Sequence, residues 1–359
     1  MTTQASAPVA QLITLRTGLA ARDGALSWLR DTLKLSLRAS LNRQTTVGWL
    51  ELLNSHPLYR ELVQIYPMMV YKIYRPYLSN ALNCARRLQV IEDHYRFVLR
   101  HGLGPLTVRL ARAPMILGQV EGKSGRAYQL EMHAVAPLER EGELMLRLLQ
   151  DGERVFSTSF VFFQGERGMA LGVGCMQGPQ DDEGQQRIKE ATRDLHGLRP
   201  KNLIVYLLRQ LGHAYGCDHL RLVGNANRTA RTALRKGKVH ADYDALWQEL
   251  DAQLRPDGDY QLACAPLTAP DMAAIPSKKR SEYRKRHDTL EALAAILQAG
   301  LQAPRLAPVA GPLHDFSTAG ADTAHERAQE AAHHLAHDLT HDLTHDIAHG
   351  DDGYRSALA

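Results

Sequence analysis

A basic turn in the middle of the chain is the clearest candidate for ligand chemistry. In the stretch ATRDLHGLRPKNLIVYLLRQLGHAYGC, residues 191–217, Arg199 and Lys201 stand directly before a helical pattern of apolar residues. The unpaired backbone N–H groups and the dipole of a helix start favour an anion. Pro200 removes one of those donors. The turn is therefore predicted either to bind an anionic group such as phosphate or to be a solvated corner.

Three other side chains are single candidates for a catalytic role. His196 lies in the basic turn, and Asn225 follows a predicted strand in VGNANR, where an amide can contact a ligand or simply form a turn. Tyr243 could act as an acid or be a half-buried tyrosine with one hydrogen bond. The sequence contains no P-loop, GxSxG, HExxH or kinase motif, so no motif identifies a catalytic residue.

A second basic segment, IPSKKRSEYRKRHD, lies shortly before the C-terminal tail. On a helix its charges would cover most of the surface, which favours a solvated segment that binds phosphate groups. Anionic lipid, nucleic acid and an acidic protein are the partners that such a segment could take. The six cationic residues are Lys278, Lys279, Arg280, Arg284, Lys285 and Arg286.

Composition limits the class of protein. The 359 residues are 44% hydrophobic and 23% charged, which is typical of a globular chain. The net charge of +4 is too small to indicate nucleic-acid or membrane binding by itself. The four cysteines form no CxxC pair, so neither a disulfide framework nor a zinc site is predicted. There is no signal peptide and no run of about 18 apolar residues, so a cytoplasmic protein without a transmembrane segment is predicted.

The pattern divides the chain into three predicted parts. Residues 1–104 form a helical region, residues 105–300 an α+β domain, and residues 301–359 a low-complexity tail. In the tail, histidines and leucines both recur every four residues, which predicts a disordered or short amphipathic segment. Histidines at this spacing can chelate a metal, but the sequence specifies no closed ligand set, and no metal site is predicted. The histidines are His333, His337, His341, His345 and His349.

One helix in the first part has an apolar stripe with basic neighbours. The pattern favours a packed helix whose long basic side chains reach solvent. A helix that lies on a membrane surface is the alternative. The stripe consists of Leu26, Leu29, Leu33 and Leu37, flanked by Arg30, Lys34 and Arg38.

The second part changes from strands to helices. RAYQLEMHAV, ELMLRLL, RVFSTSFVFF and MALGVGC are separated by short turn signals, which predicts an antiparallel meander. Helix, strand and helix patterns follow, so the fold class is α+β, with helices packed on one mixed sheet. Gly172 and Gly174 stand in the last meander strand, where glycine indicates the close approach of a backbone or a ligand.

Four separated blocks resemble one family. They are HPLYRELVQIYPMMVYKIYRPYL, ATRDLHGLRPKNL, YDALWQEL and IPSKKRSEYRKRHDTLEAL, within residues 50–295. Together they resemble the VirK/YbjX family, a bacterial domain of unknown function. The resemblance implies a Gram-negative protein linked to virulence, display of surface proteins, resistance to antimicrobial peptides and stress responses. It implies no catalytic residue.

The order of elements is also similar to that of the GNAT acyltransferases. Under this resemblance Arg199 and Lys201 would bind the pyrophosphate of CoA or another acyl thioester, and Gly172 and Gly174 would leave room for its pantetheine arm. The turn reads LRPKNL in place of the glycine-rich pattern of that superfamily. Two hypotheses follow: a GNAT-like acyltransferase acting on an envelope component, or a non-enzymatic protein that binds an anionic partner through its basic segment.

Overall fold

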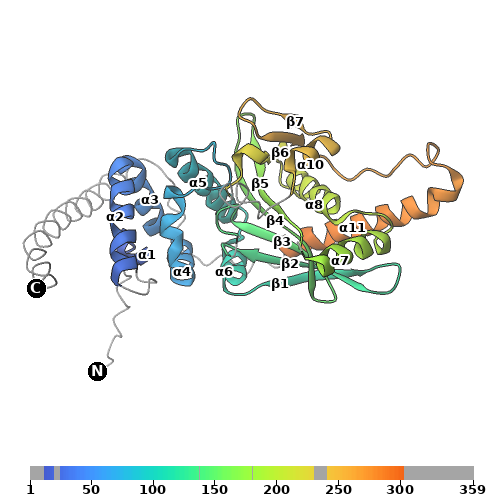
Figure 1. Cartoon of the computed structure of the whole chain (residues 1–359), viewed down its shortest axis with the longest axis horizontal. Helices are drawn as coiled ribbons and strands as arrows, with labels where there is room; N and C mark the ends of the chain where they lie inside the picture. Colours follow the sequence, from blue (N-terminus) through green and yellow to red (C-terminus); the bar gives the residue numbers. More distant parts are fainter. Residues whose placement is uncertain (1–11, 20–24, 137, 180, 230–240, 303–359) are drawn as a thin grey trace, which may run out of the picture.

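The structure is a computed structural model, and it describes residues 12–19, 25–136, 138–179, 181–229 and 241–302. Helices gather at one end of an elongated molecule and a large sheet occupies the other (Figure 1). The proposed tail, residues 301–359, lies outside the described residues from position 303 onwards. Among the described residues, no helix combines the length and the apolar character needed to cross a membrane.

The N-terminal third is helical, as predicted. The helix α5, Cys84–Arg100, begins at a side-chain cap, because the Asn83 side chain accepts a hydrogen bond from the Arg86 N–H. A buried 3₁₀ helix, Pro67–Tyr74, connects α4 to the segment before α5. The helices are α1 (Leu15–Leu19), α2 (Ala25–Leu41), α3 (Arg43–Ser55), α4 (Pro57–Ile65), α5 (Cys84–Arg100) and α6 (Gly104–Arg112).

A single mixed sheet confirms the α+β prediction. Its order is β1-β2-β3-β4-β5-β6-β8-β7, and every described pair is antiparallel except β5 with β6. The predicted meander is therefore present, with β1 as an additional edge strand. The strands are β1 (Met115–Glu121), β2 (Ala127–Ala134), β3 (Leu144–Gln150), β4 (Glu153–Gln164), β5 (Met169–Gln177), β6 (His219–Leu222), β7 (Gln253–Leu254) and β8 (Tyr260–Ala263).

In the described part of the second half, α-helices pack against the sheet and against one another. The helix α8 packs on β4, β5 and β6, while α11 packs on β1 and against α8. The first turn of α8 contains Pro200, and Gly216, with a φ of 71°, follows its last turn, as the sequence predicts. The helices are α7 (Asp182–Asp194), α8 (Pro200–Ala214), α10 (Tyr243–Glu249) and α11 (Arg280–Gln302).

The helical region and the sheet share one core. The strand β4 extends beyond its last pairing with β3, so its free N–H groups need other acceptors. The Phe162 N–H donates to His94 Nδ1 and the Gln164 N–H to the Asp93 carboxylate, both on α5. Buried apolar residues from both parts form one continuous cluster. The domain boundary at residues 104 and 105 stays a prediction.

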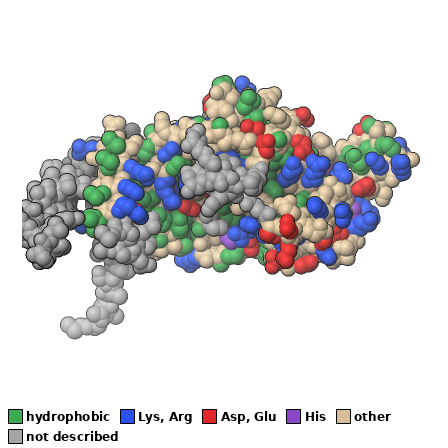
Figure 2. All heavy atoms as spheres, in the orientation of Figure 1, with side chains coloured by type: hydrophobic (Ala, Val, Ile, Leu, Met, Phe, Trp, Pro, Cys, Tyr) green, Lys and Arg blue, Asp and Glu red, His purple; other side chains and the backbone are tan. Residues whose placement is uncertain are grey.

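The prediction that the leucine stripe of α2 packs into the core is wrong. The side chains of Leu29, Leu33 and Leu37 are exposed, and Leu35 and Ala39 make the buried face instead. The side chain of Leu26 lies outside the described residues. Figure 2 shows hydrophobic and basic side chains next to each other at the end of the molecule that holds α2. The leucine stripe is therefore exposed on the surface of the protein, and core packing does not explain it.

Candidate anion-binding site

The basic turn before α8 already holds an anion, which is a carboxylate of the same chain. Arg199 Nη1 lies 2.6 Å from Glu249 Oε1, and Lys201 Nζ lies 2.9 Å from Glu249 Oε2. Hydrogen bonds from Lys201 and Asn202 hold the pKa of Glu249 below its usual range. The residue types of the turn do attract an anion, but Glu249 comes from α10, far along the chain.

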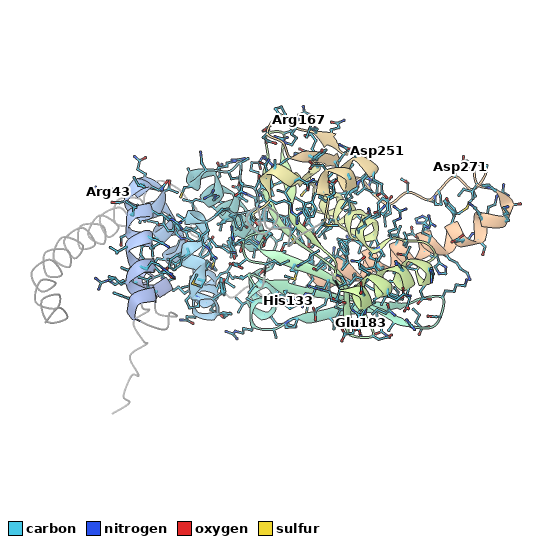
Figure 3. The ribbon with its side chains drawn as sticks, viewed as in Figure 1. Arg43, His133, Arg167, Glu183, Asp251 and Asp271 are labelled. Carbon is cyan, nitrogen blue, oxygen red and sulfur yellow. The ribbon has the colours of Figure 1, made fainter. Side chains whose placement is uncertain are left out.

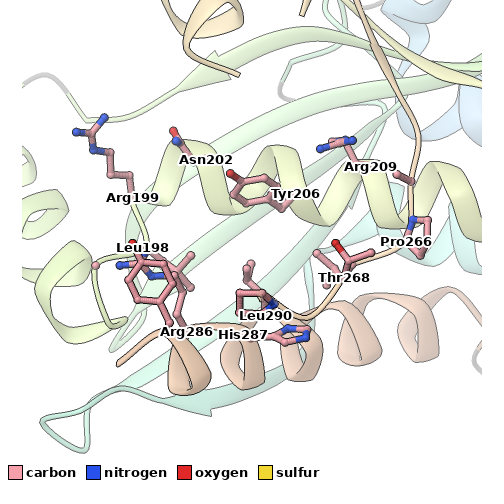
Figure 4. A pocket seen from close by; sticks show the side chains of 15 residues that line it. Leu198, Arg199, Asn202, Tyr206, Arg209, Pro266, Thr268, Arg286, His287 and Leu290 are labelled. Atoms are coloured by element: carbon pink, nitrogen blue, oxygen red, sulfur yellow. The ribbon is translucent and has the colours of Figure 1, made fainter. Parts of the chain in front are cut away.

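A cavity of about 530 Å³ opens on the other side of the same turn, between α8 and α11 (Figure 4). Arg199 and Asn202 reach its edge from α8, so the turn contributes to both places. No Asp or Glu is among the lining residues that the structure describes, which gives this part of the cavity a cationic character. The other lining residues are Gly197, Leu198, Tyr206, Arg209, Ala265, Pro266, Leu267, Thr268, Pro270, Tyr283, Arg286, His287 and Leu290.

Two arginines of this pocket are held by backbone carbonyl groups. Arg209 Nε donates to the Ala263 carbonyl oxygen at 3.0 Å, and Arg286 Nε donates to the His196 carbonyl oxygen at 2.9 Å. Neither guanidinium forms an ion pair with any residue in the described part of the chain. The Arg286 guanidinium group also lies over the Tyr283 ring, with 4.7 Å between Cζ and the ring centroid. Guanidinium groups can bind a carboxylate or phosphate in a fork geometry.

The turn at His196 and Gly197 has the backbone shape that Arg286 requires. The φ angles are 55° at His196 and 78° at Gly197, in the left-handed region. A Cβ atom at Gly197 would lie 2.6 Å from Arg286 Nη2, so a larger residue would displace the guanidinium group, and the positive φ itself favours glycine. Burial and then the Lys285 charge lower the pKa of the His196 imidazole. His196 contributes its carbonyl group to the pocket, and its catalytic role stays a prediction.

The basic segment divides between the pocket and the surface. Arg286 lines the pocket, whereas Lys278, Lys279, Arg284 and Lys285 are exposed and have no ion pair within the described residues. The Arg280 Nε donates to the Ile275 carbonyl oxygen. Figure 2 shows basic side chains gathered towards the end of the molecule where α11 begins. The two basic features of the sequence therefore meet at one site, which the sequence spacing alone did not reveal.

Gly172 and Gly174 are explained by packing within this chain. A Cβ atom at Gly174 would overlap the Glu141 carbonyl oxygen, and one at Gly172 would lie 3.0 Å from atoms of Leu78 and Phe163. The loop before β3 and the segment before α5 thus occupy the space above β5. The close approach predicted from the two glycines is that of the chain itself, and room for a pantetheine arm is not apparent there.

Replacing Gly174 with alanine is expected to lower the free energy of unfolding by about 2–3 kcal/mol, because backbone atoms cannot move aside easily. Urea unfolding followed by circular dichroism measures this difference. Gly48→Ala is the matched control, since its Cβ would meet only Leu88 at 3.6 Å, inside a helix where alanine is favoured. Equal stability of the Gly174→Ala protein and the wild type would contradict the packing explanation.

Asn225 and Tyr243 join α10 to the sheet. The Tyr243 hydroxyl donates to the Met176 carbonyl oxygen and accepts from the Met176 N–H, both at 2.7 Å. Asn225 Oδ1 accepts from the Tyr243 N–H, and Asn225 Nδ2 donates to Asp242. Burial raises the pKa of Tyr243 well above its usual range. These contacts account for both residues structurally, and a catalytic role for either stays a prediction.

A buried ionic network was missed by sequence reasoning. Glu143, directly before β3, accepts hydrogen bonds from Lys72 Nζ at 2.6 Å and from the hydroxyl groups of Tyr77 and Tyr95 at 2.7 Å. Burial raises the pKa of Glu143, but the Lys72 charge, the electrostatic interaction with His94 and the hydrogen bonds outweigh this effect and hold the pKa below normal. Because all these groups are buried, the network links the helical region to the sheet and does not form a solvent-accessible site.

The histidine beside this network is expected to make stability depend on pH. Burial lowers the pKa of His94 to about 4, from an ordinary value of 6.5. Between these two values the unfolded chain binds a proton that the folded chain does not, so acid destabilises the fold. The loss is expected to reach about 3 kcal/mol by pH 4.

Unfolding of the wild type and of His94→Leu in urea, at neutral pH and near pH 4.5, measures this contribution. The substitution is expected to reduce the pH dependence, because it removes the proton that the unfolded chain gains. An identical pH dependence in both proteins would assign the acid sensitivity to other groups.

The arrangement defines an α+β protein with a cationic pocket between two helices. Residues 24–299 match the family described as "Protein of unknown function (DUF535)", and the chain belongs to this family. The "Uncharacterized protein YbjX" of Escherichia coli is 28% identical over 269 residues, covering 72% of this chain and 80% of the relative. This similarity confirms the VirK/YbjX resemblance.

Two further similar proteins come from other bacteria. An uncharacterized protein of Haemophilus influenzae is 26% identical over 268 residues, which cover 75% of this chain and 88% of that protein. The "Membrane protein LapB" of Mannheimia haemolytica is 24% identical over 200 residues, which cover 55% and 84% respectively. No solved structure matches the chain.

Proposed function

We propose that this protein binds an anionic ligand in the pocket between α8 and α11 and acts as a binding protein in support of the Gram-negative envelope. The observation that carries the proposal is the pair Arg209 and Arg286. Both are oriented by backbone carbonyl groups and leave their terminal nitrogens without a carboxylate partner among the described residues. Figure 4 shows the two side chains on different sides of the cavity, so each guanidinium group would bind a separate anionic group of the ligand.

The shape of the pocket favours an organic anion over a bare ion. Besides the cationic groups, the side chains of Tyr206, Leu198 and Leu290 line the cavity. Such a mixture of apolar walls and a few charged groups is typical of sites for small organic ligands. The exposed basic residues at positions 278–285 would attract the ligand from solution, so association should weaken as salt concentration rises.

The family context gives this binding a physiological setting. The VirK/YbjX resemblance supports a role in envelope integrity, virulence and resistance to antimicrobial peptides or stress. The printed name of the Mannheimia haemolytica relative contains the words "membrane protein". We propose the cytoplasm as the location, with a phosphate-bearing envelope component as the ligand.

Acyl transfer is the second candidate, because a specific feature of the topology favours it. The meander is followed by α7 and α8, by β6 parallel to β5, and then by the Asn225 turn and α10. This order is similar to that of the GNAT resemblance, with α7 as an additional helix. An acyl thioester would have to displace Glu249 from Arg199 and Lys201 to place its pyrophosphate at the start of α8. The packing above Gly174 leaves its arm without an evident path.

Thermal unfolding with a panel of anions tests these two candidates. The panel contains glycerol phosphate as a headgroup fragment, a short oligonucleotide, CoA and a long-chain acyl-CoA. At a ligand concentration of about a hundred times the dissociation constant, the stabilisation is expected to be about 2.7 kcal/mol. A shift with glycerol phosphate supports the binding function, whereas a shift limited to thioesters, with release of free thiol, supports acyl transfer. No shift with any anion would reject both.

A further inference from the structure

The exposed face of α2 is the least explained surface of the molecule. Four leucines recur every four residues along it, and their exposed fractions rise from 42% at Leu29 to 75% at Leu41. Leu33 and Leu37 lie between them, at 55% and 62%. Positions four apart on a helix are neighbours, so the four side chains form one continuous apolar row. A contiguous apolar patch on a protein surface marks an interaction site.

Positive charge follows this row along one side. Arg30, Lys34 and Arg38 each come one position after a leucine of the row, and all three are exposed. Arg30 forms an exposed contact with Asp31, whereas Lys34 and Arg38 form no ion pair within the described ranges. A second copy of the chain would bring two such positive rows together, which like-charge repulsion disfavours.

We infer that α2 docks on an anionic membrane surface, with the leucine row between the lipid chains and Arg30, Lys34 and Arg38 at the headgroups. A helix with this division lies in the interface, where its affinity depends on buried apolar area and on attraction to anionic lipid. The backbone of α2 is already folded onto the protein through Leu35 and Ala39, so docking does not require the helix to form at the membrane.

The position of α2 leaves the pocket free during docking. Arg43, which begins α3 directly after α2, lies at one end of the molecule, and Asp271, beside the pocket residue Pro270, lies near the other (Figure 3). The anion-binding pocket would therefore lie at a distance from the docked end of the molecule. Docking through α2 is independent of the proposed function, because the two surfaces share no residue.

Flotation of the full-length protein with lipid vesicles tests this inference. Vesicles of phosphatidylglycerol mixed with phosphatidylcholine should carry the protein to the top of the gradient, and vesicles of phosphatidylcholine alone should carry much less. The double variant Leu33→Asp and Leu37→Asp is expected to bind about tenfold more weakly or worse, because it removes apolar contact and adds negative charge. Both positions are exposed, so the variant should still fold.

Leu254→Asp is the matched control, because Leu254 is an equally exposed leucine on β7, and its substitution should leave flotation unchanged. Substituting both Arg209 and Arg286 with alanine should also leave flotation unchanged, which separates this inference from the proposed function. Equal flotation of the α2 double variant and the wild type would overturn the inference. So would a loss of flotation that follows charge reversal at positions 278–285 alone.

The same experiments would also identify two other binding partners of the exposed leucine row of α2. Absence of flotation, together with a dimer that the double variant dissociates, would assign the face to a second copy. Absence of flotation by a monomer, with α2 amides that exchange slowly until the double variant is made, would assign it to another segment of the chain. Either result would overturn the membrane inference.

Discussion

Replacing Glu143 with alanine is expected to lower the free energy of unfolding by about 3–5 kcal/mol, because it leaves the Lys72 ammonium buried without its partner. The side chains of Lys72 and Glu143 are 2% and 0% exposed, so water cannot replace the lost carboxylate. The hydroxyl groups of Tyr77 and Tyr95 also lose their acceptor. Urea unfolding at neutral pH, followed by circular dichroism and tryptophan fluorescence, measures the loss.

An exposed ion pair provides the matched control. Arg112 Nη2 lies 3.1 Å from Glu61 Oε2, and both side chains are largely in solvent. Glu61→Ala is therefore expected to change stability by at most about 1 kcal/mol. A combined Lys72→Met and Glu143→Leu variant should recover much of the loss, because no buried charge then lacks a partner. A loss below about 1 kcal/mol for Glu143→Ala would show that the site is hydrated or rearranges.

The second large effect concerns the pocket. Replacing both Arg209 and Arg286 with alanine is expected to weaken binding of the phosphate-bearing ligand about a hundredfold, since a hydrogen bond to a charged group contributes about 1.5–3 kcal/mol. Calorimetric titration of the ligand selected by the thermal panel measures the change. Each single variant should account for about half of the loss in free energy, because the two arginines come from different helices.

Two controls separate loss of binding from loss of structure. Arg100→Ala removes an exposed arginine at the end of α5 and should leave the affinity unchanged. Arg209→Lys keeps the charge but not the fork geometry, so it should bind with intermediate affinity. Arg286→Ala also frees the His196 carbonyl group, so its unfolding is measured without ligand. Wild-type affinity in the Arg209→Ala protein would exclude the pocket as the site.

The local part of the fold could be read from the sequence. The apolar residues Ile204, Leu207, Leu208 and Leu211 recur at helical spacing between Pro200 and Gly216. The helix α8 has these limits because each signal acts within a few residues. Alternation in AYQLEMHA likewise predicted β2, whose burial alternates residue by residue. The strand β1 was not predicted, because its exposed edge position and the bulge near Gly118 weaken the alternating pattern.

The site could be predicted only in its parts. Arg199, Lys201 and Arg286 were recognised as cationic residues that favour an anion, and this preference follows from their chemistry alone. Their partners could not be identified, because Glu249 reaches the turn from α10 and the His196 carbonyl group reaches Arg286 from the turn before α8. Arg209 was missed, because its position depends on the Ala263 carbonyl group at the end of β8. The leucine row of α2 shows the same limit, since its spacing fits either a core or a membrane surface.

The sequence by itself determined many of the helices and strands, the mixed α+β class, the family and the two basic features. These properties depend on neighbours along the chain, whose spacing is fixed by covalent geometry. Tertiary structure alone decided that Glu249 neutralises one side of the turn, that Arg209 and Arg286 remain available on the other, and that Lys72 meets Glu143. Contacts between residues that are distant in the sequence depend on how the helices and strands pack. The sequence position of a charged residue therefore does not indicate which partner it contacts.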